Sequence, residues 1–297
     1  MIKVTFDIYS GRPNPEYILS DKIAEETLKE ISLNKGIITE RNTNYNKLGY
    51  RGINISLESN YISDSYDLPS SFSIANGSSV SESKGMEIAE NLLQKVANAP
   101  SSLQDNSSID VNLNKWIMTQ IKNFPIPTLV ENLKHKSQVS ENIGTSCPYE
   151  KIVFDPDFWN SPEHLINNNC YNFATNQRTD SFAQPGRATG QMYRVLTCEE
   201  VTKGAIADGC QEATSCFLEV EAPRFLIALV IAPGPTFFDY HWYRQCSNGN
   251  WAHKPGQTPA VDVDNSNQII IDPSIADRGD YTVFCGYMLS PKSVNVQ

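Results

Sequence analysis

The chain has 297 residues, of which 40% are hydrophobic and 20% charged, and its formal net charge is −10. This composition is typical of a soluble globular protein with one large or two ordinary domains. The acidic charge argues against a nucleic-acid partner, because phosphate binding needs clustered Lys and Arg. The longest apolar stretch, FLIALVIA at residues 225–232, is too short for a membrane span and predicts a buried strand.

The first part of the chain predicts a small α+β domain at residues 1–125. Residues 2–9 alternate between apolar and other side chains, as in a half-buried strand, and the glycine and prolines of SGRPNP end this pattern. Further strands are expected near residues 53–57 and 72–75. Helices are expected from Ser20, over residues 84–97 and over NLNKWIMTQIKNF. The sequence assigns no role to this domain.

Polar and proline-containing segments separate this part from the rest of the chain. APSSLQDNSS begins at residue 99 and FPIPTL at residue 124, so we expect the boundary within residues 99–146 and a second domain at residues 147–297. All seven cysteines lie in that second domain, and residues 1–125 contain no histidine. Any thiol chemistry is therefore expected in the second domain.

The first residues, MIKVTFDIYSGRPNP, lack the apolar core of a secretory signal. We therefore expect a protein that is cytoplasmic or exported by a route without such a signal. The sequence leaves the oligomeric state open.

The cysteine pattern predicts neither a metal nor another cofactor. Seven is an odd number, so at least one cysteine must be free or paired between chains. No Cys-x-x-Cys pair and no Cys/His cluster at zinc spacing is present. Cys198, Cys210 and Cys216 are close enough in sequence to form a local disulfide in an oxidising environment, and ordinary reduced thiols are the alternative.

Residues 167–180, NNNCYNFATNQRTD, place Cys170 directly before helix-compatible residues. Asn169 is a good N-cap residue, so Cys170 is expected in the first turn of a helix. A helix N-terminus lowers the pKa of a thiol, because unpaired N–H groups and the aligned dipole favour the thiolate. Cys170 is therefore a candidate nucleophile whose own backbone N–H faces the oxyanion. A buried structural cysteine and a disulfide partner are the alternatives.

Four histidines are available as a general base. His135 and His164 lie in polar segments, and we expect both on the surface. His241 and His253 lie in DYHWYRQCSNGNWAHKPG, which predicts a hairpin with a turn at SNG. Adjacent strands bring the two imidazoles together, so that His241 can accept the thiol proton while His253 orients it.

This order of Cys, His and His resembles the NlpC-type papain-like cysteine peptidases. Asn169-Cys170-Tyr171-Asn172-Phe173 is similar to the Asp-Cys-x-x-Phe-like string at a helix start in that family, with Asn in place of Asp. In the family a second His follows the first by about twelve positions, and here 253 minus 241 is twelve. The resemblance covers residues 158–290 and leaves the first domain unexplained.

The resemblance implies an α+β fold with a papain-like C-terminal domain, in which the helix that carries the nucleophile packs on an antiparallel sheet. It implies that Cys170 is the nucleophile, that His241 is the general base and acid, and that His253 orients His241. The activity would be hydrolysis of a peptide or amide bond through a thioester, with a peptide or protein as substrate. By family analogy, a cell-wall peptide is the first substrate class to expect.

Other functions remain open from the sequence. The Asn-Cys-x-x-Phe string is also similar to lecithin retinol acyltransferase-like enzymes, and transglutaminase-like enzymes run Cys, His, Asp, with Asp262, Asp264 or Asp272 as the third member. An acyltransferase, a transglutaminase or a deamidase effector is therefore an alternative to a hydrolase. A non-enzymatic binding protein or toxin component with its cysteines in disulfides is the alternative from a different class.

Overall fold

The computed structural model describes residues 1–19, 21–40, 47–97, 109–124 and 144–297. The chain forms two compact units. Unit 1 comprises Met1–Ile8, Asn14–Tyr45 and Tyr50–Asn132, and unit 2 comprises Tyr9–Pro13, Asn46–Gly49 and Leu133–Gln297. Both units combine helices with antiparallel sheet, so the expected α+β class is confirmed. The short segments Tyr9–Pro13 and Asn46–Gly49 had no sequence signal that assigned them to the second unit.

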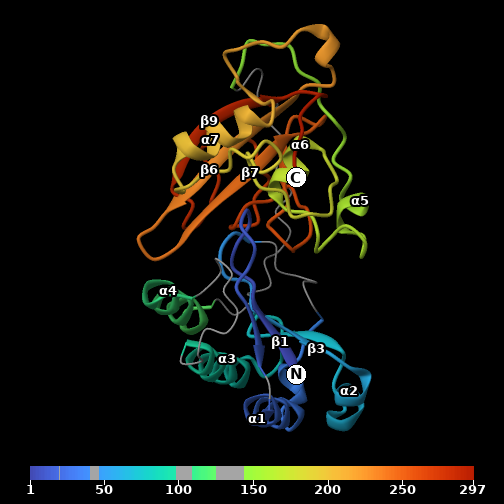
Figure 1. The fold of residues 1–297 in the computed structure, drawn as a ribbon, viewed down its shortest axis with the longest axis vertical. Helices are drawn as coiled ribbons and strands as arrows, with labels where there is room; N and C mark the ends of the chain where they lie inside the picture. Colours follow the sequence, from blue (N-terminus) through green and yellow to red (C-terminus); the bar gives the residue numbers. More distant parts are fainter. Residues whose placement is uncertain (20, 41–46, 98–108, 125–143) are drawn as a thin grey trace. The chain divides into compact units, whose positions relative to one another are not determined.

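Unit 1 is an antiparallel sheet with helices packed against it (Figure 1). The strand order is β2-β1-β3-β4, with β1 at Ile2–Phe6, β2 at Glu16–Leu19, β3 at Ile53–Leu57 and β4 at Ser71–Ile74. The helices are α1 at Asp21–Ser32, α2 at Asn60–Tyr66, α3 at Glu82–Ala97 and α4 at Val111–Lys122, with a 3-10 turn, η1, at Lys35–Ile37. The expected strands and helices are all among these elements, whereas β2 and α2 are not expected from the sequence.

The first strand ends earlier than its alternating pattern predicts. Ile2, Val4 and Phe6 are fully buried in unit 1, as a half-buried strand requires. Beyond Phe6 the chain makes a loop whose residues 9–13 belong to unit 2. The apolar residues after Phe6 therefore continue the pattern in sequence but not in the sheet.

Unit 2 is built on a five-stranded antiparallel sheet of order β5-β9-β6-β7-β8. Its strands are β5 at Gln211–Glu212, β6 at Phe225–Pro233, β7 at Phe238–Gln245, β8 at Trp251–His253 and β9 at Val283–Ser290. Its helices are α5 at Pro156–Asn160, α6 at Cys170–Thr175 and α7 at Cys198–Ala207, with a 3-10 turn, η2, at Glu219–Glu221.

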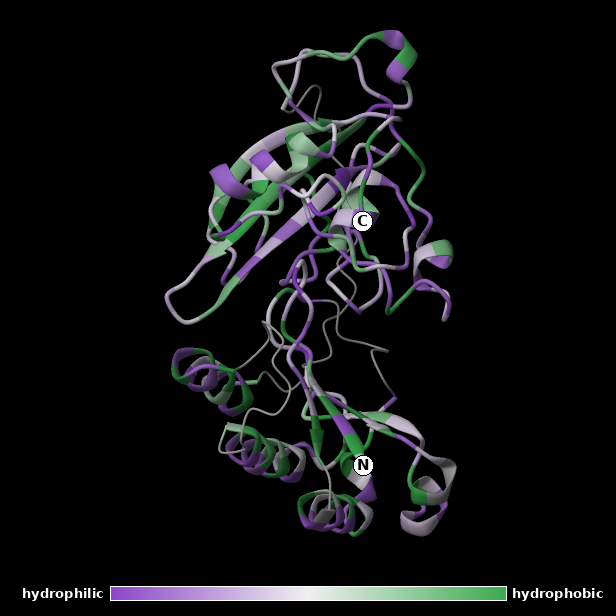
Figure 2. Cartoon of the chain, viewed as in Figure 1, coloured by the Kyte–Doolittle hydropathy of each residue, from purple (hydrophilic) through white to green (hydrophobic). Residues whose placement is uncertain are grey.

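The core of unit 2 lies between the sheet and two helices. Strand β6, the predicted buried strand, is hydrophobic along its length (Figure 2). On one face, side chains of β6 and β7 form a single buried cluster with side chains of α6 and α7. That cluster includes Cys170, Tyr171, Val201, Leu229, Tyr240 and Trp242. The sheet therefore fixes the position of α6, which carries the candidate nucleophile.

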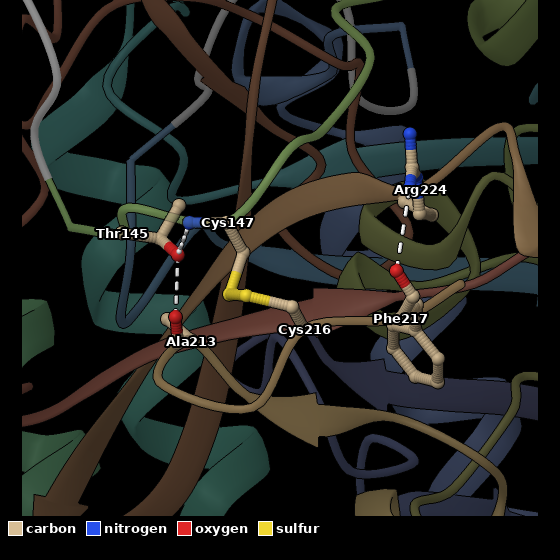
Figure 3. The surroundings of a disulfide bond; sticks show 6 residues. All are labelled: Thr145, Cys147, Ala213, Cys216, Phe217 and Arg224. Carbon is tan, nitrogen blue, oxygen red and sulfur yellow. Dashed lines mark hydrogen bonds between the residues drawn. A yellow bond between two sulfur atoms is a disulfide. The ribbon is translucent and has the colours of Figure 1, made fainter. Parts of the chain in front are cut away.

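Two disulfide bonds tie segments of unit 2 together. Cys147 pairs with Cys216 (Figure 3), and Cys198 pairs with Cys285. Of the two alternatives for Cys198, Cys210 and Cys216, a local disulfide is not formed, and only Cys210 is a free thiol. The reason is topological, because α7 packs on the sheet and so places Cys198 beside β9. Free thiols remain at Cys170, Cys210 and Cys246, all buried, which agrees with the odd cysteine count.

Among the described helices, none combines the length and apolar character that a bilayer-crossing segment needs.

Replacing both Cys198 and Cys285 with serine should lower the free energy of unfolding by about 2–5 kcal/mol. The bond joins residues 87 positions apart, so its loss frees a long loop in the unfolded chain. Urea unfolding followed by circular dichroism measures the difference. Reductant should then destabilise the variant less than it destabilises the wild type. An unchanged unfolding midpoint would contradict the pairing.

Candidate functional site

The hairpin of β7 and β8 brings the two candidate histidines together. Tyr243 pairs with His253 across the hairpin, and His241 lies two residues before Tyr243 on β7. The Nε2 atom of His241 is 2.8 Å from the Nδ1 atom of His253. Both side chains are buried, with exposures of 0% and 1%. The predicted hairpin and the pairing of its imidazoles are therefore confirmed.

The hydrogen bonds of this pair run in one direction. The Nε2 atom of His253 is 3.0 Å from the carbonyl oxygen of Val263. A carbonyl only accepts, so Nε2 of His253 must carry the hydrogen, and Nδ1 of a neutral His253 must accept. His241 then donates from its own Nε2, which leaves the lone pair of a neutral His241 on Nδ1. The carbonyl of Val263 thus sets the tautomer of both rings, and Nδ1 of His241 is the basic nitrogen.

Aromatic side chains surround the imidazole pair. Tyr243 stacks on His253 with ring centroids 5.0 Å apart and meets His241 edge-on at 4.8 Å. Tyr281 lies edge-on to His241, with ring centroids 6.1 Å apart. These contacts fix the planes of both rings and keep water away from them.

Cys170 is the first residue of α6, as the sequence predicts. The Oδ1 atom of Asn169 accepts hydrogen bonds from the backbone N–H groups of Tyr171 and Asn172, at 3.1 and 3.2 Å. The side chain of Asn172 accepts from the Asn169 N–H at 3.1 Å, which completes a reciprocal cap. The N-cap is thus confirmed, and it fixes the helix start on which Cys170 stands.

The sulfur of Cys170 lies beside the peptide that links His241 to Trp242. The backbone N–H of Trp242 acts on the Cys170 thiol and lowers the thiol pKa, by less than burial raises it. Cys170 packs with the side chains of Tyr240 and Trp242. Because side chains alternate along a strand, His241 projects from the opposite face of β7. The structure therefore brings the sulfur to the backbone of His241, and it directs the imidazole to the other side of the strand.

Burial raises the pKa of the Cys170 thiol well above its usual range. The charge of Asp239 adds to this increase, while the Trp242 N–H and the Lys254 ammonium lower the pKa by less. The expectation of a lowered pKa at the helix N-terminus is therefore wrong for this conformation. Removal of the thiolate from water outweighs the helix terminus.

The loop of residues 9–13 is held against the start of α6. The carbonyl oxygen of Gly11 accepts hydrogen bonds from the Asn169 side chain at 2.8 Å, from the Gln184 side chain at 2.7 Å and from the Tyr240 hydroxyl at 3.1 Å. The sequence predicts Asn169 as a helix cap and none of these three contacts with Gly11. These partners lie more than 150 positions from Gly11, so no local pattern connects them.

The remaining candidates have other roles or lie elsewhere. His135 lies outside the described residues. His164 is buried rather than exposed as expected. Its Nδ1 atom forms a hydrogen bond with the carbonyl of Phe158 at 2.6 Å. Asp264 and Asp272 accept backbone N–H groups within their own loops, from Gln268 and Ser274. Among the described residues, no group of His, Cys, Asp and Glu side chains is arranged to hold a metal ion.

Comparison with known proteins adds one named relative. The chain is 45% identical over 135 residues to insoluble matrix shell protein 1 of Ruditapes philippinarum. That stretch is 46% of this chain and 87% of the relative. No family model and no solved structure matches the chain.

The hydrogen-bond direction through the two rings can be tested by nuclear magnetic resonance. With nitrogen-15 in the histidine rings and at about pH 8, above the usual imidazole pKa, both His241 and His253 should show the Nε2–H tautomer. Replacing His253 with phenylalanine should remove this preference at His241, because the acceptor is lost. His164 provides an internal reference in the same spectra. A Nδ1–H tautomer at His241 in the wild type would contradict the assignment.

Proposed function

The chain belongs to the same family as insoluble matrix shell protein 1. We propose two functions for it, a cysteine hydrolase in unit 2 and a non-enzymatic matrix protein, and the histidine pair favours the hydrolase. One observation carries this proposal. The hydrogen bonds from Val263 through His253 put the basic nitrogen of His241 at Nδ1. The packing of α6 on an antiparallel sheet supports a papain-like arrangement for the unit.

In the proposed reaction Cys170 attacks the carbonyl carbon of a peptide or amide, and its thiol proton moves to Nδ1 of His241. Nδ1 of His253 accepts a hydrogen bond from the Nε2–H of His241, which stabilises the His241 imidazolium. The leaving amine takes the proton from His241, and a thioester remains on Cys170. Water then gives a proton to His241 and attacks the thioester, which releases the acid and restores the thiol.

The described conformation supports a latent form of such an enzyme. The thiol is fully buried, and its raised pKa keeps it protonated at neutral pH. The His241 ring projects from the other face of β7. Proton transfer from Cys170 therefore requires a rearrangement, either of the start of α6 or of the part of β7 around His241. We therefore propose that an opening step precedes catalysis.

A non-enzymatic matrix protein is the second proposed function. The relative is named as an insoluble matrix protein of a shell, and the two disulfides of unit 2 are typical of an oxidising, extracellular environment. In this function Cys170 and the histidine pair are core residues, and the partner is another matrix macromolecule.

Replacing Cys170 with alanine distinguishes the two functions. If the chain is a hydrolase, turnover of a peptide or amide substrate library should fall by roughly a thousandfold or more, because the nucleophile is lost. The matched control is Cys210→Ala, which removes another buried free thiol of the same unit and should retain activity. Equal turnover by the wild type and Cys170→Ala would reject the hydrolase.

The raised pKa of Cys170 predicts slow labelling of the native protein. Iodoacetamide should modify Cys170 slowly at neutral pH, and the rate should increase with pH because only the thiolate reacts. Peptide mass spectrometry measures this rate, with Cys210, whose pKa burial raises to about 12, as a comparison in the same sample. The denatured chain should label rapidly at all three free thiols. Rapid native labelling of Cys170 at neutral pH would contradict the closed, protonated form.

A further inference from the structure

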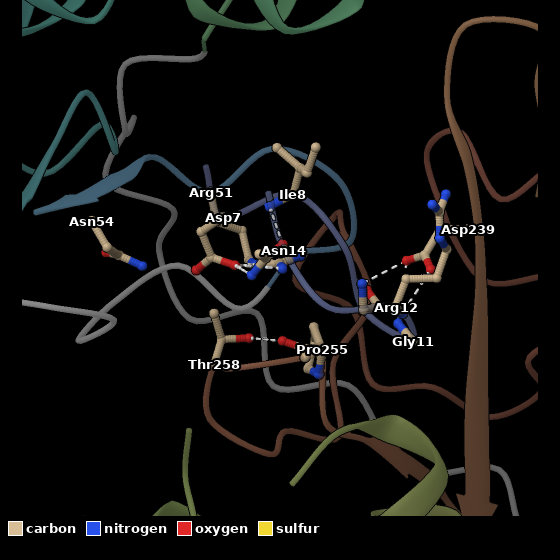
Figure 4. Close-up of polar contacts among 12 residues, drawn as sticks. Asp7, Ile8, Gly11, Arg12, Asn14, Arg51, Asn54, Asp239, Pro255 and Thr258 are labelled. Carbon is tan, nitrogen blue, oxygen red and sulfur yellow. Dashed lines mark hydrogen bonds and ion pairs between the residues drawn. The ribbon is translucent and has the colours of Figure 1, made fainter. Parts of the chain in front are cut away.

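The segment Ser10–Arg12 is held at the tip of a loop with a fixed base. The side chain of Asn14 accepts the backbone N–H of Ile8 at 2.9 Å and donates to Asp7 at 3.0 Å (Figure 4). Asp7 also forms a buried ion pair with Arg51 at 2.7 Å. These bonds join the two ends of the loop on the unit 1 side, while residues 9–13 belong to unit 2.

The carboxylate of Asp239 binds the main chain of this segment. It accepts the backbone N–H groups of Ser10 at 2.5 Å, Gly11 at 3.3 Å and Arg12 at 3.1 Å (Figure 4). The hydroxyl of Tyr281 donates to the same carboxylate at 2.5 Å. Asp239 is fully buried, so these donors replace water around its charge. All three peptide contacts use backbone atoms, which any peptide of the same conformation presents.

The carbonyl oxygen of Gly11 is bound by a second group of buried side chains. Its three donors are the amide nitrogens of Asn169 and Gln184 and the hydroxyl of Tyr240, and all three side chains are fully buried. Asp239 and these donors all bind Gly11. Asp239 accepts its N–H, and the three donors bind its carbonyl oxygen. Together they form a site for one bent stretch of peptide main chain, which we call the main-chain site.

The main-chain site selects glycine at its centre. A Cβ atom on Gly11 would lie 2.4 Å from the ring of Tyr240, which is fully buried and cannot move aside freely. The next residue is less constrained, since the Arg12 guanidinium donates to the carbonyl of Phe238 at 2.8 Å at an exposed position. The bound sequence is therefore defined by a glycine and by main-chain geometry.

The main-chain site adjoins the candidate catalytic residues along the chain. Asn169 directly precedes Cys170, and Tyr240 directly precedes His241. The Tyr240 side chain packs in the same cluster as Cys170. A peptide carbonyl held by Asn169 and Tyr240 is thus held on the face of β7 that packs against Cys170.

We propose that Asp239, Asn169, Gln184 and Tyr240 form a binding site for a glycine-containing peptide, and that Ser10–Arg12 is its resident, inhibitory occupant. A substrate peptide takes the place of the segment, with its glycine carbonyl bound by the three donors and its carbonyl carbon presented to Cys170. The inhibitory part rests on the proposed hydrolase function, whereas the binding site does not depend on it.

The test displaces the segment Ser10–Arg12 by adding one methyl group at Gly11. Gly11→Ala should expel the segment from the main-chain site and increase the rate of native Cys170 alkylation by about tenfold or more, because local opening exposes the thiol. Gly85→Ala is the matched control, since its Cβ would meet its nearest neighbour at an ordinary 3.5 Å and should change nothing. Arg12→Ala, which removes the bond to Phe238, the contact with the Tyr9 ring and a positive charge near Asp239 but keeps Gly11 in the site, should give a smaller increase.

Labelling of the other thiols separates displacement from unfolding. Cys210 and Cys246 should stay protected in Gly11→Ala, whereas an unfolded variant would label at all three thiols, and Arg12→Ala then provides the test. Added acetyl-Ser-Gly-Arg-Pro-amide should restore protection of Cys170 in the opened variant, and the same peptide with alanine for glycine should not. Unchanged Cys170 labelling in a folded Gly11→Ala, or equal protection by both peptides, overturns the main-chain site.

Activity measurements address the inhibitory part separately. Gly11→Ala should turn over glycine-containing peptide amides faster than the wild type, and Cys170→Ala should abolish this gain. Exposed Cys170 with peptide-dependent protection but without turnover would retain the binding site and reject the hydrolase and the inhibition together.

Discussion

The buried carboxylate of Asp239 is the group on which the arrangement around Cys170 depends. A charge removed from water needs hydrogen-bond donors, and here Ser10, Gly11, Arg12 and Tyr281 supply them. Burial raises the pKa of Asp239, and its hydrogen bonds to Tyr281 and the segment lower the pKa in part. Any movement of the segment leaves this charge with fewer donors. The closed form is thus maintained by an electrostatic requirement as well as by packing.

Asn169 connects this constraint to Cys170. Its side-chain oxygen caps α6, and its side-chain nitrogen donates to the carbonyls of Gly11 and Ala183. One amide therefore fixes both the start of the helix and the position of the segment. An aspartate in its place could cap the helix but could not donate these hydrogen bonds. The difference from the Asp-Cys string of the peptidases thus has a structural reason within unit 2.

Local features of the site could be predicted from sequence, and environmental ones could not. The cap at Asn169, the helix start at Cys170 and the hairpin of His241 and His253 depend on neighbouring residues, and all are as expected. The raised pKa of Cys170 depends on burial and on a carboxylate 69 positions away, and the donors to Gly11 come from three distant segments. The disulfide partners likewise follow from the packing of α7 on the sheet.

The histidine pair favours a chemical role over a purely structural one. Burying a polar side chain lowers stability unless its hydrogen bonds are satisfied, and apolar side chains of similar size fill a core without this requirement. His241 and His253 are both buried, and their bond to each other depends on a third group, the Val263 carbonyl. A matrix protein gains nothing obvious from a chain of bonds that fixes the basic nitrogen of one ring. A general base needs that fixed nitrogen, and for this reason we propose the hydrolase first, although the sulfur of Cys170 and the ring of His241 lie on opposite faces of β7.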